Sequence, residues 1–212
     1  MELWNEVVVE KSYELLNKLK KEFGFVLIGG WASWFYTKTM KSKDIDIYVD
    51  FKDFFSFQEI LAKRGIFITL NQKLKKYSAK IDEVDIDIYT PNYCTLIIPC
   101  KDIFSEKWFK NIDGFNVILP EPFLLLKLKA EEDRKETIKG FKDRVDILAL
   151  IYNLDLDKKF LSNLEKRYKF DIRRRVLSII KNSKEEFRYF FSEPENLRSL
   201  KKLKLELVKK MS

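Results

Sequence analysis

The stretch LIGGWASWFYTKTMKSKDIDIYVDF, residues 27–51, indicates the fold most directly. It reads as an apolar strand, the adjacent glycines Gly29 and Gly30, a helix, and a second strand with Asp44 and Asp46 one residue apart. Residues i and i+2 of a strand project from the same face, about 6.6 Å apart, so the two carboxylates should point together. Such neighbours repel each other unless a cation lies between them. Oxygen donors favour Mg²⁺ or Mn²⁺, and the alternative is an exposed strand face with two solvated acids.

Two further features favour the metal site over the solvated face. Gly29 and Gly30 end a strand and open a helix, so their N–H groups and the helix N-terminus would form a phosphate cradle close to the carboxylates. The segment EVDIDIYTP is a second alternating strand that offers Asp85 and Asp87 on one face. If the two strands pair, a third carboxylate reaches the metal site.

The chain contains no histidine, and this excludes several classes of enzyme. Ser-His-Asp and Cys-His hydrolases, HExxH peptidases and zinc deaminases all need an imidazole as base or ligand. Cys94 and Cys100 have no second pair that would complete a four-ligand zinc site, and we expect two buried, reduced thiols. The chemistry must therefore use carboxylates, Lys, Arg, Tyr or an oxygen-bound metal.

The chain divides into two parts of different pattern. Residues 1–120 read as a mixed α/β domain and residues 121–212 as an α-helical domain, with turns near Gly140, at 155–157 and at 192–194. The helices expected in the first part are 2–23, 30–38 and 52–65. The expected strands are 25–29, 44–51, 65–71, 73–81, 83–90, 95–99 and 114–120.

Charge divides at the same place as the secondary structure. Acidic and basic side chains balance in residues 1–120, so the formal net charge of +8 comes from residues 121–212. The richest basic stretches are DIRRRVLSIIK, residues 171–181, and LRSLKKLKLELVKKMS, residues 197–212. They are candidates for a nucleic-acid contact surface, and the alternative is the solvated face of ordinary surface helices.

A second group of charged residues follows LPEP, residues 119–122. Lys127 and Arg134 are seven residues apart and share a helix face, while Asp143 and Asp146 lie on the next helix. Asp143 would orient Lys127, or the two would form a structural salt bridge between the helices.

On these residues the sequence resembles the nucleotidyltransferase superfamily with the DNA polymerase β-like fold. Within it, the sequence is similar to the AbiEii-type branch found as toxins of toxin–antitoxin pairs. The first motif is a hydrophobic strand, Gly-Gly, a helix and then D-x-D between apolar residues, and it covers VLIGGWASWFYTKTMKSKDIDIYV. The second motif reads here as Lys127, Ala130, Arg134, Lys142, Asp143 and Asp146.

The resemblance implies an α+β fold, with a mixed-sheet core in 1–120 and a helical domain in 121–212, and a metal-dependent enzyme. A nucleoside triphosphate would lie over Gly29 and Gly30, and Ser42 is a further candidate for binding it. The metal ligands would be Asp44, Asp46 and Asp87, with Asp85 as the alternate. Asp87 is preferred because it immediately precedes the strand ending typical of the superfamily, a hydrophobic residue followed by Tyr-Thr-Pro, here IYTP at residues 88–91. Lys127 and Arg134 would neutralise the leaving pyrophosphate.

The acceptor we expect is an RNA, with a tRNA end as one candidate, bound by the basic helices. The alternatives are a small hydroxylated molecule, as in antibiotic-modifying relatives, a protein, or a non-enzymatic nucleotide-binding or partner-binding module. The resemblance also implies an antitoxin as partner. No apolar run reaches the roughly 20 residues that span a bilayer, and the N-terminus is acidic, so we expect a cytoplasmic protein.

Overall fold

The computed structural model describes residues 6–211, which form two compact units. Unit 1 is Met1–Phe35 with Lys41–Leu119, and unit 2 is Tyr36–Met40 with Pro120–Ser212. The part of the expected N-terminal helix that falls on residues 2–5 lies outside the described residues.

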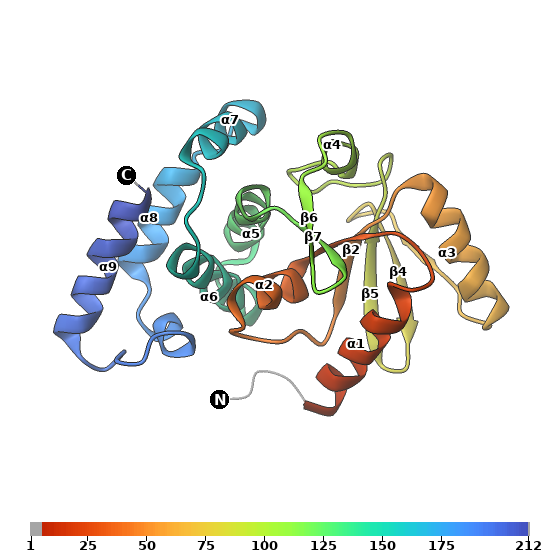
Figure 1. The fold of residues 1–212 in the computed structure, drawn as a ribbon, viewed down its shortest axis with the longest axis horizontal. Coiled ribbons are helices and arrows are strands. Elements are labelled where there is room, and N and C mark those ends of the chain that lie inside the picture. The colour runs from red at the N-terminus through yellow and green to blue at the C-terminus, as the bar shows by residue number, and fades with distance from the viewer. Residues whose placement is uncertain (1–5, 212) are drawn as a thin grey trace. The chain divides into compact units, whose positions relative to one another are not determined.

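Unit 1 is built on a mixed seven-stranded sheet (Figure 1) with strand order β3-β4-β5-β2-β1-β7-β6. Strand β2 pairs parallel with β5 and β1 pairs parallel with β7, while the other neighbours are antiparallel. The strands are β1 (Val26–Ile28), β2 (Ile45–Tyr48), β3 (Thr69–Asn71), β4 (Lys76–Ile81), β5 (Val84–Tyr89), β6 (Phe109–Ile112) and β7 (Phe115–Ile118). The helices of this unit are α1 (Glu6–Leu19), α2 (Gly29–Thr37), α3 (Phe51–Lys63) and α4 (Cys100–Ser105).

Alternation along the central strands separates the core from the polar positions. Ile45 and Ile47 of β2 are fully buried and pair with the buried Ile86 and Ile88 of β5, whereas Asp46 between the first two is half-buried. A period of two places these isoleucines on one face of the sheet and the aspartates on the other. The prediction that the isoleucines face the core is confirmed.

Three features of unit 1 differ from the sequence predictions, and the first is helix α4, which was not predicted. The apolar segment 95–99 forms no strand: Ile98 is buried, and its carbonyl oxygen accepts a 2.7 Å hydrogen bond from the Tyr48 hydroxyl. Strand β6 was not predicted. It forms a hairpin with β7 through Asp113 and Gly114, both at positive φ, which is the geometry that an Asp-Gly pair favours.

Unit 2 is helical, as its sequence pattern predicts. It contains α5 (Pro120–Arg134), α6 (Ile138–Asn153), α7 (Lys158–Tyr168), α8 (Ile172–Asn182), the 3₁₀ helix η1 (Glu185–Tyr189) and α9 (Leu197–Met211). The turn expected near Gly140 comes earlier, because Thr137 caps α6 by accepting the Gly140 N–H at 3.0 Å. A Cβ on Gly140 would lie 2.8 Å from the Lys135 Cα, so the close approach of the preceding turn explains this glycine.

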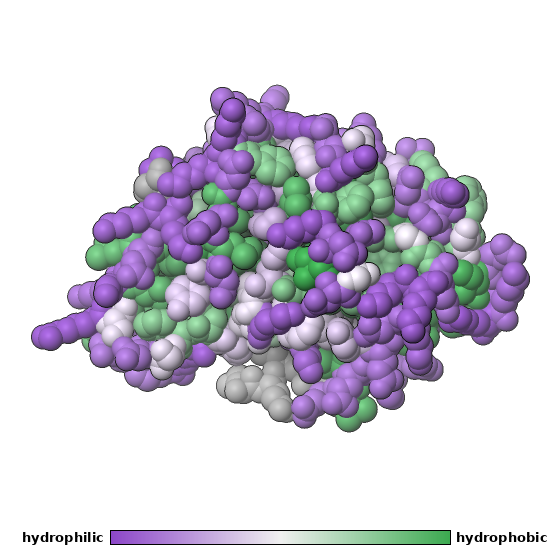
Figure 2. All heavy atoms as spheres, in the orientation of Figure 1, coloured by the Kyte–Doolittle hydropathy of each residue, from purple (hydrophilic) through white to green (hydrophobic). Residues whose placement is uncertain are grey.

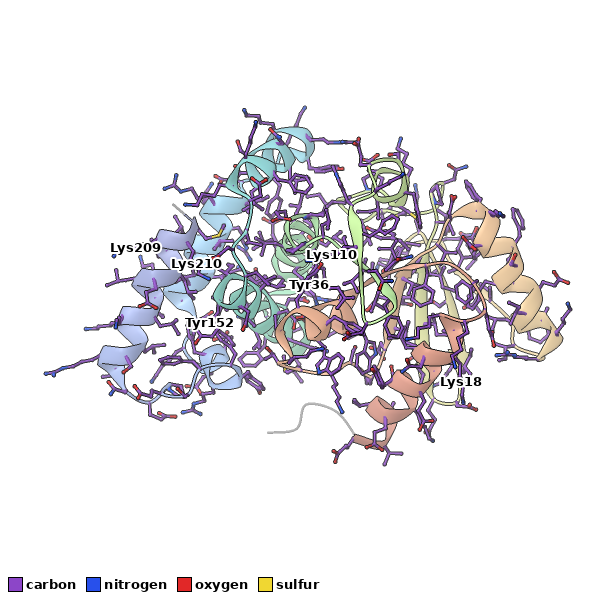
Figure 3. The ribbon with its side chains drawn as sticks, viewed as in Figure 1. Lys18, Tyr36, Lys110, Tyr152, Lys209 and Lys210 are labelled. Atoms are coloured by element: carbon purple, nitrogen blue, oxygen red, sulfur yellow. The ribbon has the colours of Figure 1, made fainter. Side chains whose placement is uncertain are left out.

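Charged side chains hold the helices of unit 2 to one another. The buried Glu131 of α5 accepts hydrogen bonds from Arg175 of α8, with its Nε at 2.9 Å, and its other oxygen lies 3.5 Å from Arg144 of α6. Near the end of α9, Lys210 donates to the carbonyl of Tyr152 at 3.0 Å, and both residues are labelled in Figure 3. Basic side chains of this unit therefore have structural roles.

Candidate active site

Asp46 and Asp87 are brought together by the pairing of β2 with β5. They are partners in the parallel register, so their side chains project from the same face of adjacent strands about 4.8 Å apart. Both are half-buried, and the chain contains no histidine that could share a cation with them. Two neighbouring acids and an all-oxygen donor set suit a hard divalent cation.

Gly29 is fixed at the start of α2 by its backbone and by Asp46. Its φ is +67°, and Ile28 before it pairs with Asp46 across the antiparallel β1/β2 ladder. A Cβ on Gly29 would lie 2.6 Å from the Asp46 Cγ, well inside van der Waals contact. The first N–H groups of α2 and the Asp46 carboxylate are therefore neighbours, and only a residue without a side chain fits between them.

Asp87 has two partners on β4 that the sequence analysis missed. The Lys76 ammonium forms an ion pair with Asp87 Oδ2, and the Ser78 hydroxyl donates to Asp87 Oδ1 at 2.9 Å. Ser78 lies opposite Asp87 in the antiparallel β4/β5 ladder, and Lys76 is two residues away on the same face. A two-residue turn at Asp82 and Glu83 predicts this register. The segment 73–81 contains four lysines, however, and its sequence pattern alone does not show which of them contacts Asp87.

The remaining candidates of unit 1 lie at different depths. Asp44 is half-buried just before β2, Ser42 and Gly30 are buried, and Asp85 is exposed and pairs with Lys80 of β4. Among residues 6–211, no set of three Asp, Glu, Cys or His side chains converges as a metal site. Asp46 and Asp87 fit a divalent cation by position and donor chemistry, and a metal bound through Asp87 Oδ2 would compete with Lys76 for that oxygen.

The second group of candidate residues forms a buried ion-pair cluster within unit 2. Lys127 of α5 contacts Asp146 Oδ2 at 2.6 Å and Asp143 Oδ1 at 3.1 Å, both on α6. Arg134 Nε lies 2.7 Å from Asp143 Oδ2. The side chains of Lys127, Asp143 and Asp146 are at most 8% exposed, whereas that of Arg134 is 40% exposed. The inter-helix salt bridge considered for Asp143 is present, and Asp146 is a second partner.

Burial and pairing act in opposite directions on this cluster. Burial alone would raise the pKa of Asp143, but Lys127 and Arg134 outweigh it, so the pKa of Asp143 is below its usual value. Burial alone would lower the pKa of Lys127, but Asp146 and Asp143 raise it above its usual value. Asp143 and Lys127 are therefore both charged at neutral pH, and each stabilises the charge of the other.

The cysteines carry no metal or nucleophilic site in the described part of the chain. Both are free, Cys100 is buried, and Cys94 is only half-buried, so the expectation of two buried thiols holds fully for Cys100 alone. Burial raises the pKa of both thiols, which keeps them protonated and unreactive at neutral pH.

Comparison with known proteins gives relatives by structure and none by sequence. No protein-family model matches the chain, and no curated protein matches it. Among solved structures, JHP933 from Helicobacter pylori is 13% identical with a TM-score of 0.53, and the match covers 98% of this chain and 91% of that one.

Two further structures carry nucleotidyl-transfer chemistry in their own names. The Megavirus polyadenylate synthase is 18% identical with a TM-score of 0.50 over 70% of this chain, and the chain spans only 32% of that protein. ANT(2")-Ia, solved in complex with adenylyl-2"-tobramycin, is 14% identical with a TM-score of 0.51, over 78% of this chain and 98% of that chain.

These likenesses establish the fold. The mixed seven-stranded sheet with a following helical region is the arrangement shared with nucleotidyltransferases, and the α+β prediction is confirmed. The AbiEii-type branch and the roles of individual residues stay predictions. No helix within residues 6–211 is long and apolar enough to span a membrane.

Proposed function

We propose that this protein is a metal-dependent nucleotidyltransferase that moves a nucleoside monophosphate from a nucleoside triphosphate to a hydroxyl group of an RNA. The observation that carries the proposal is the register of Asp46 with Asp87, together with Gly29 held against Asp46 at the start of α2. A carboxylate pair beside the first N–H groups of a helix suits a triphosphate with its divalent cation.

The proposed reaction forms one bond and breaks another at the α-phosphorus. The acceptor oxygen attacks, the bond to the β-phosphate breaks, and pyrophosphate leaves. Asp44, Asp46 and Asp87 would hold Mg²⁺ or Mn²⁺, which when bound stabilises charge on the attacking and leaving oxygens. The N–H groups at Gly29 and Gly30 would bind phosphate, and Asp87 would hold the metal or take the acceptor proton. The roles of Ser42, Lys127, Arg134 and Asp143 in nucleotide binding remain predictions.

RNA is the acceptor favoured by the surface of unit 2. Arg173 and Arg174 of α8 and Lys201 and Lys202 of α9 are exposed. In Figure 2, hydrophilic side chains project from the region of α9 with hydrophobic residues between them, and the exposed Leu197 and Leu205 belong to this helix. Exposed cations on neighbouring helices suit the phosphate backbone of an RNA.

The test is incubation with each of the four α-labelled triphosphates, total RNA and Mg²⁺, followed by gel electrophoresis. We expect label in one or more RNA bands, none with a chelator, and none with Asp46→Asn. Label confined to protein bands would indicate a protein acceptor. Absence of transfer to RNA, protein and small molecules by the folded protein would refute the enzymatic proposal in favour of a nucleotide-binding module.

A small hydroxylated acceptor is the second candidate, favoured by the likeness to a protein solved with adenylyl-2"-tobramycin. It predicts label on an added aminoglycoside in thin-layer chromatography and no dependence on the basic residues of α8 and α9. A toxin–antitoxin role, implied by the AbiEii-type resemblance, predicts growth arrest on expression of the wild type and normal growth with Asp46→Asn.

A further inference from the structure

Lys76 is the side chain whose position the proposed mechanism does not explain. It lies on β4, its ammonium contacts Asp87 Oδ2, and its side chain is only 15% exposed. The partner carboxylate is 24% exposed, so the pair is shielded more than an ordinary surface ion pair. Ser78 occupies the other oxygen of Asp87, at 2.9 Å.

The contact follows from the ladder register rather than from chance at the surface. Ser78 is opposite Asp87, so Lys76 is its diagonal neighbour on the same face, within reach of a long side chain. Asp46 stands beside Asp87 on the other flanking strand, β2. The Lys76 ammonium therefore contacts one member, Asp87, of two acids that face each other across adjacent strands about 4.8 Å apart.

We propose that Lys76 is an internal counter-cation of the Asp46/Asp87 pair, which competes with the divalent metal for Asp87 and weakens binding of the metal without nucleotide. This inference rests on the proposed function only in naming the ligands, a divalent metal and a nucleoside triphosphate. A lysine suits the role because its ammonium is a point charge on a flexible stem and can leave a carboxylate without moving the backbone. An arriving triphosphate offers the displaced ammonium a new anionic partner.

The consequence is a coupling between metal and nucleotide. Metal alone must displace Lys76 from Asp87, whereas metal arriving with a triphosphate leaves the ammonium a phosphate to contact. By linkage, the triphosphate then raises metal affinity more in the wild type than in a variant without the ammonium. Lys76 is thus a positioning residue that favours joint binding of the two ligands.

The experiment measures Mn²⁺ binding by electron paramagnetic resonance on protein freed of metal, with Lys76→Gln as the test variant. Removal of a partly exposed ion pair should lower the Kd for Mn²⁺ about fivefold, the equivalent of about 1 kcal/mol. Lys76→Arg keeps the charge and should not tighten binding, while Asp87→Asn should weaken it. Lys52→Gln, an exposed lysine on α3, controls for the loss of one positive charge in the same unit.

Three outcomes would overturn the inference. Unchanged or weaker Mn²⁺ binding by Lys76→Gln shows that Lys76 does not compete. If Lys80→Gln binds Mn²⁺ more tightly and Lys76→Gln does not, the metal ligand is Asp85, which is opposite Lys80 in the β4/β5 ladder. Mn²⁺ binding that Asp87→Asn leaves unchanged removes Asp87 from the site. Circular dichroism melts of each variant confirm that the compared proteins are folded.

The transfer assay separates this inference from the proposed function. If the protein transfers label to an acceptor but Lys76→Gln does not bind Mn²⁺ more tightly, the proposed function stands and the role of Lys76 is wrong. If Lys76→Gln binds Mn²⁺ more tightly but the protein transfers label to no acceptor, the role of Lys76 stands and the proposed function is wrong. The Mn²⁺ titration is then repeated in the presence of a non-hydrolysable triphosphate. The increase in Mn²⁺ affinity that the triphosphate causes should be smaller in Lys76→Gln than in the wild type.

Discussion

Gly29→Ala tests the site through its closest contact, and Gly65→Ala is a matched control in the same unit. Both glycines have similar positive φ values, +67° and +71°. A Cβ at Gly65 meets nothing within 4 Å, whereas a Cβ at Gly29 would lie 2.6 Å from the Asp46 Cγ. The two variants therefore share the backbone strain and differ in the overlap with Asp46.

The magnitudes follow from these two terms. An alanine at positive φ costs about 1–2 kcal/mol, part of which is offset by the lower entropy of the unfolded chain. Overlap with a packed side chain adds about 1–3 kcal/mol at Gly29 alone. For a chain of this size, each 1 kcal/mol shifts the melting temperature by about 2–4 °C. Gly29→Ala should thus melt roughly 2–12 °C below Gly65→Ala.

The assay pairs thermal melts with Mn²⁺ titration of both variants. Gly65→Ala should bind Mn²⁺ as the wild type does, and Gly29→Ala should bind it weakly because Asp46 has to move. Equal melting temperatures for the two variants would show that Gly29 does not hold the Asp46 carboxylate. Wild-type Mn²⁺ affinity in Gly29→Ala would show that this carboxylate is not a metal ligand.

The ion pairs of unit 2 give three more predictions. Lys127→Met should lower the free energy of unfolding by about 3–5 kcal/mol, because it removes the cation that the buried Asp143 and Asp146 share, while Asp143 keeps Arg134. Further neutralisation by Asp146→Asn should recover part of the loss in urea denaturation. The depressed pKa of Asp143 contributes stability that is fully present above its unfolded pKa of about 3.9 and is lost as the pH falls through the folded pKa. The free energy of unfolding of Asp143→Asn should therefore fall less steeply at acid pH than that of the wild type. Charge reversal of Arg173 and Arg174 should weaken RNA binding and its salt dependence with no change in melting, whereas Arg175→Glu should lower the melting temperature, because Arg175 pairs with a buried carboxylate. Thermal melts that are unchanged by Lys127→Met or Arg175→Glu would contradict the assignment of these side chains to structure.

Strands of the sheet were predictable where an apolar pattern is bounded by turn-forming residues. Residues 25–29, 44–51 and 83–90 each carry a period of two or a buried run between turn residues, and each contains a strand. Segment 95–99 has the same apolar character, but Ile98 is buried by tertiary contact and its carbonyl bonds to a side chain instead of a neighbouring strand. Periodicity reports burial, and only pairing partners decide whether a buried run becomes a strand.

The site was predictable only along each strand, and the partners across strands were not. Spacing alone predicts Asp44 and Asp46 on one face, and the choice of Asp87 over Asp85 came only from the resemblance. The register of β5 shows Asp87 beside Asp46. Lys76 reaches Asp87 from a third strand, and no local pattern marks that lysine among its neighbours. Spacing fixes which way a side chain points, while ladder register fixes what it meets.

Internal pairing also changes what the charge of unit 2 implies for binding. The excess of positive charge in residues 121–212 suggested a broad basic surface, but part of that charge lies against carboxylates of the same unit. A cation bound to a carboxylate adds little to the field that a polyanion meets at a distance of about 8–10 Å or more in salt. The cations paired with buried carboxylates include Lys127, Arg134, Arg144 and Arg175, and the exposed ones on α8 and α9 include Arg173, Arg174, Lys201 and Lys202. An RNA contact in unit 2 should therefore depend on the exposed set, and neutralising the paired set should change stability rather than the salt dependence of binding.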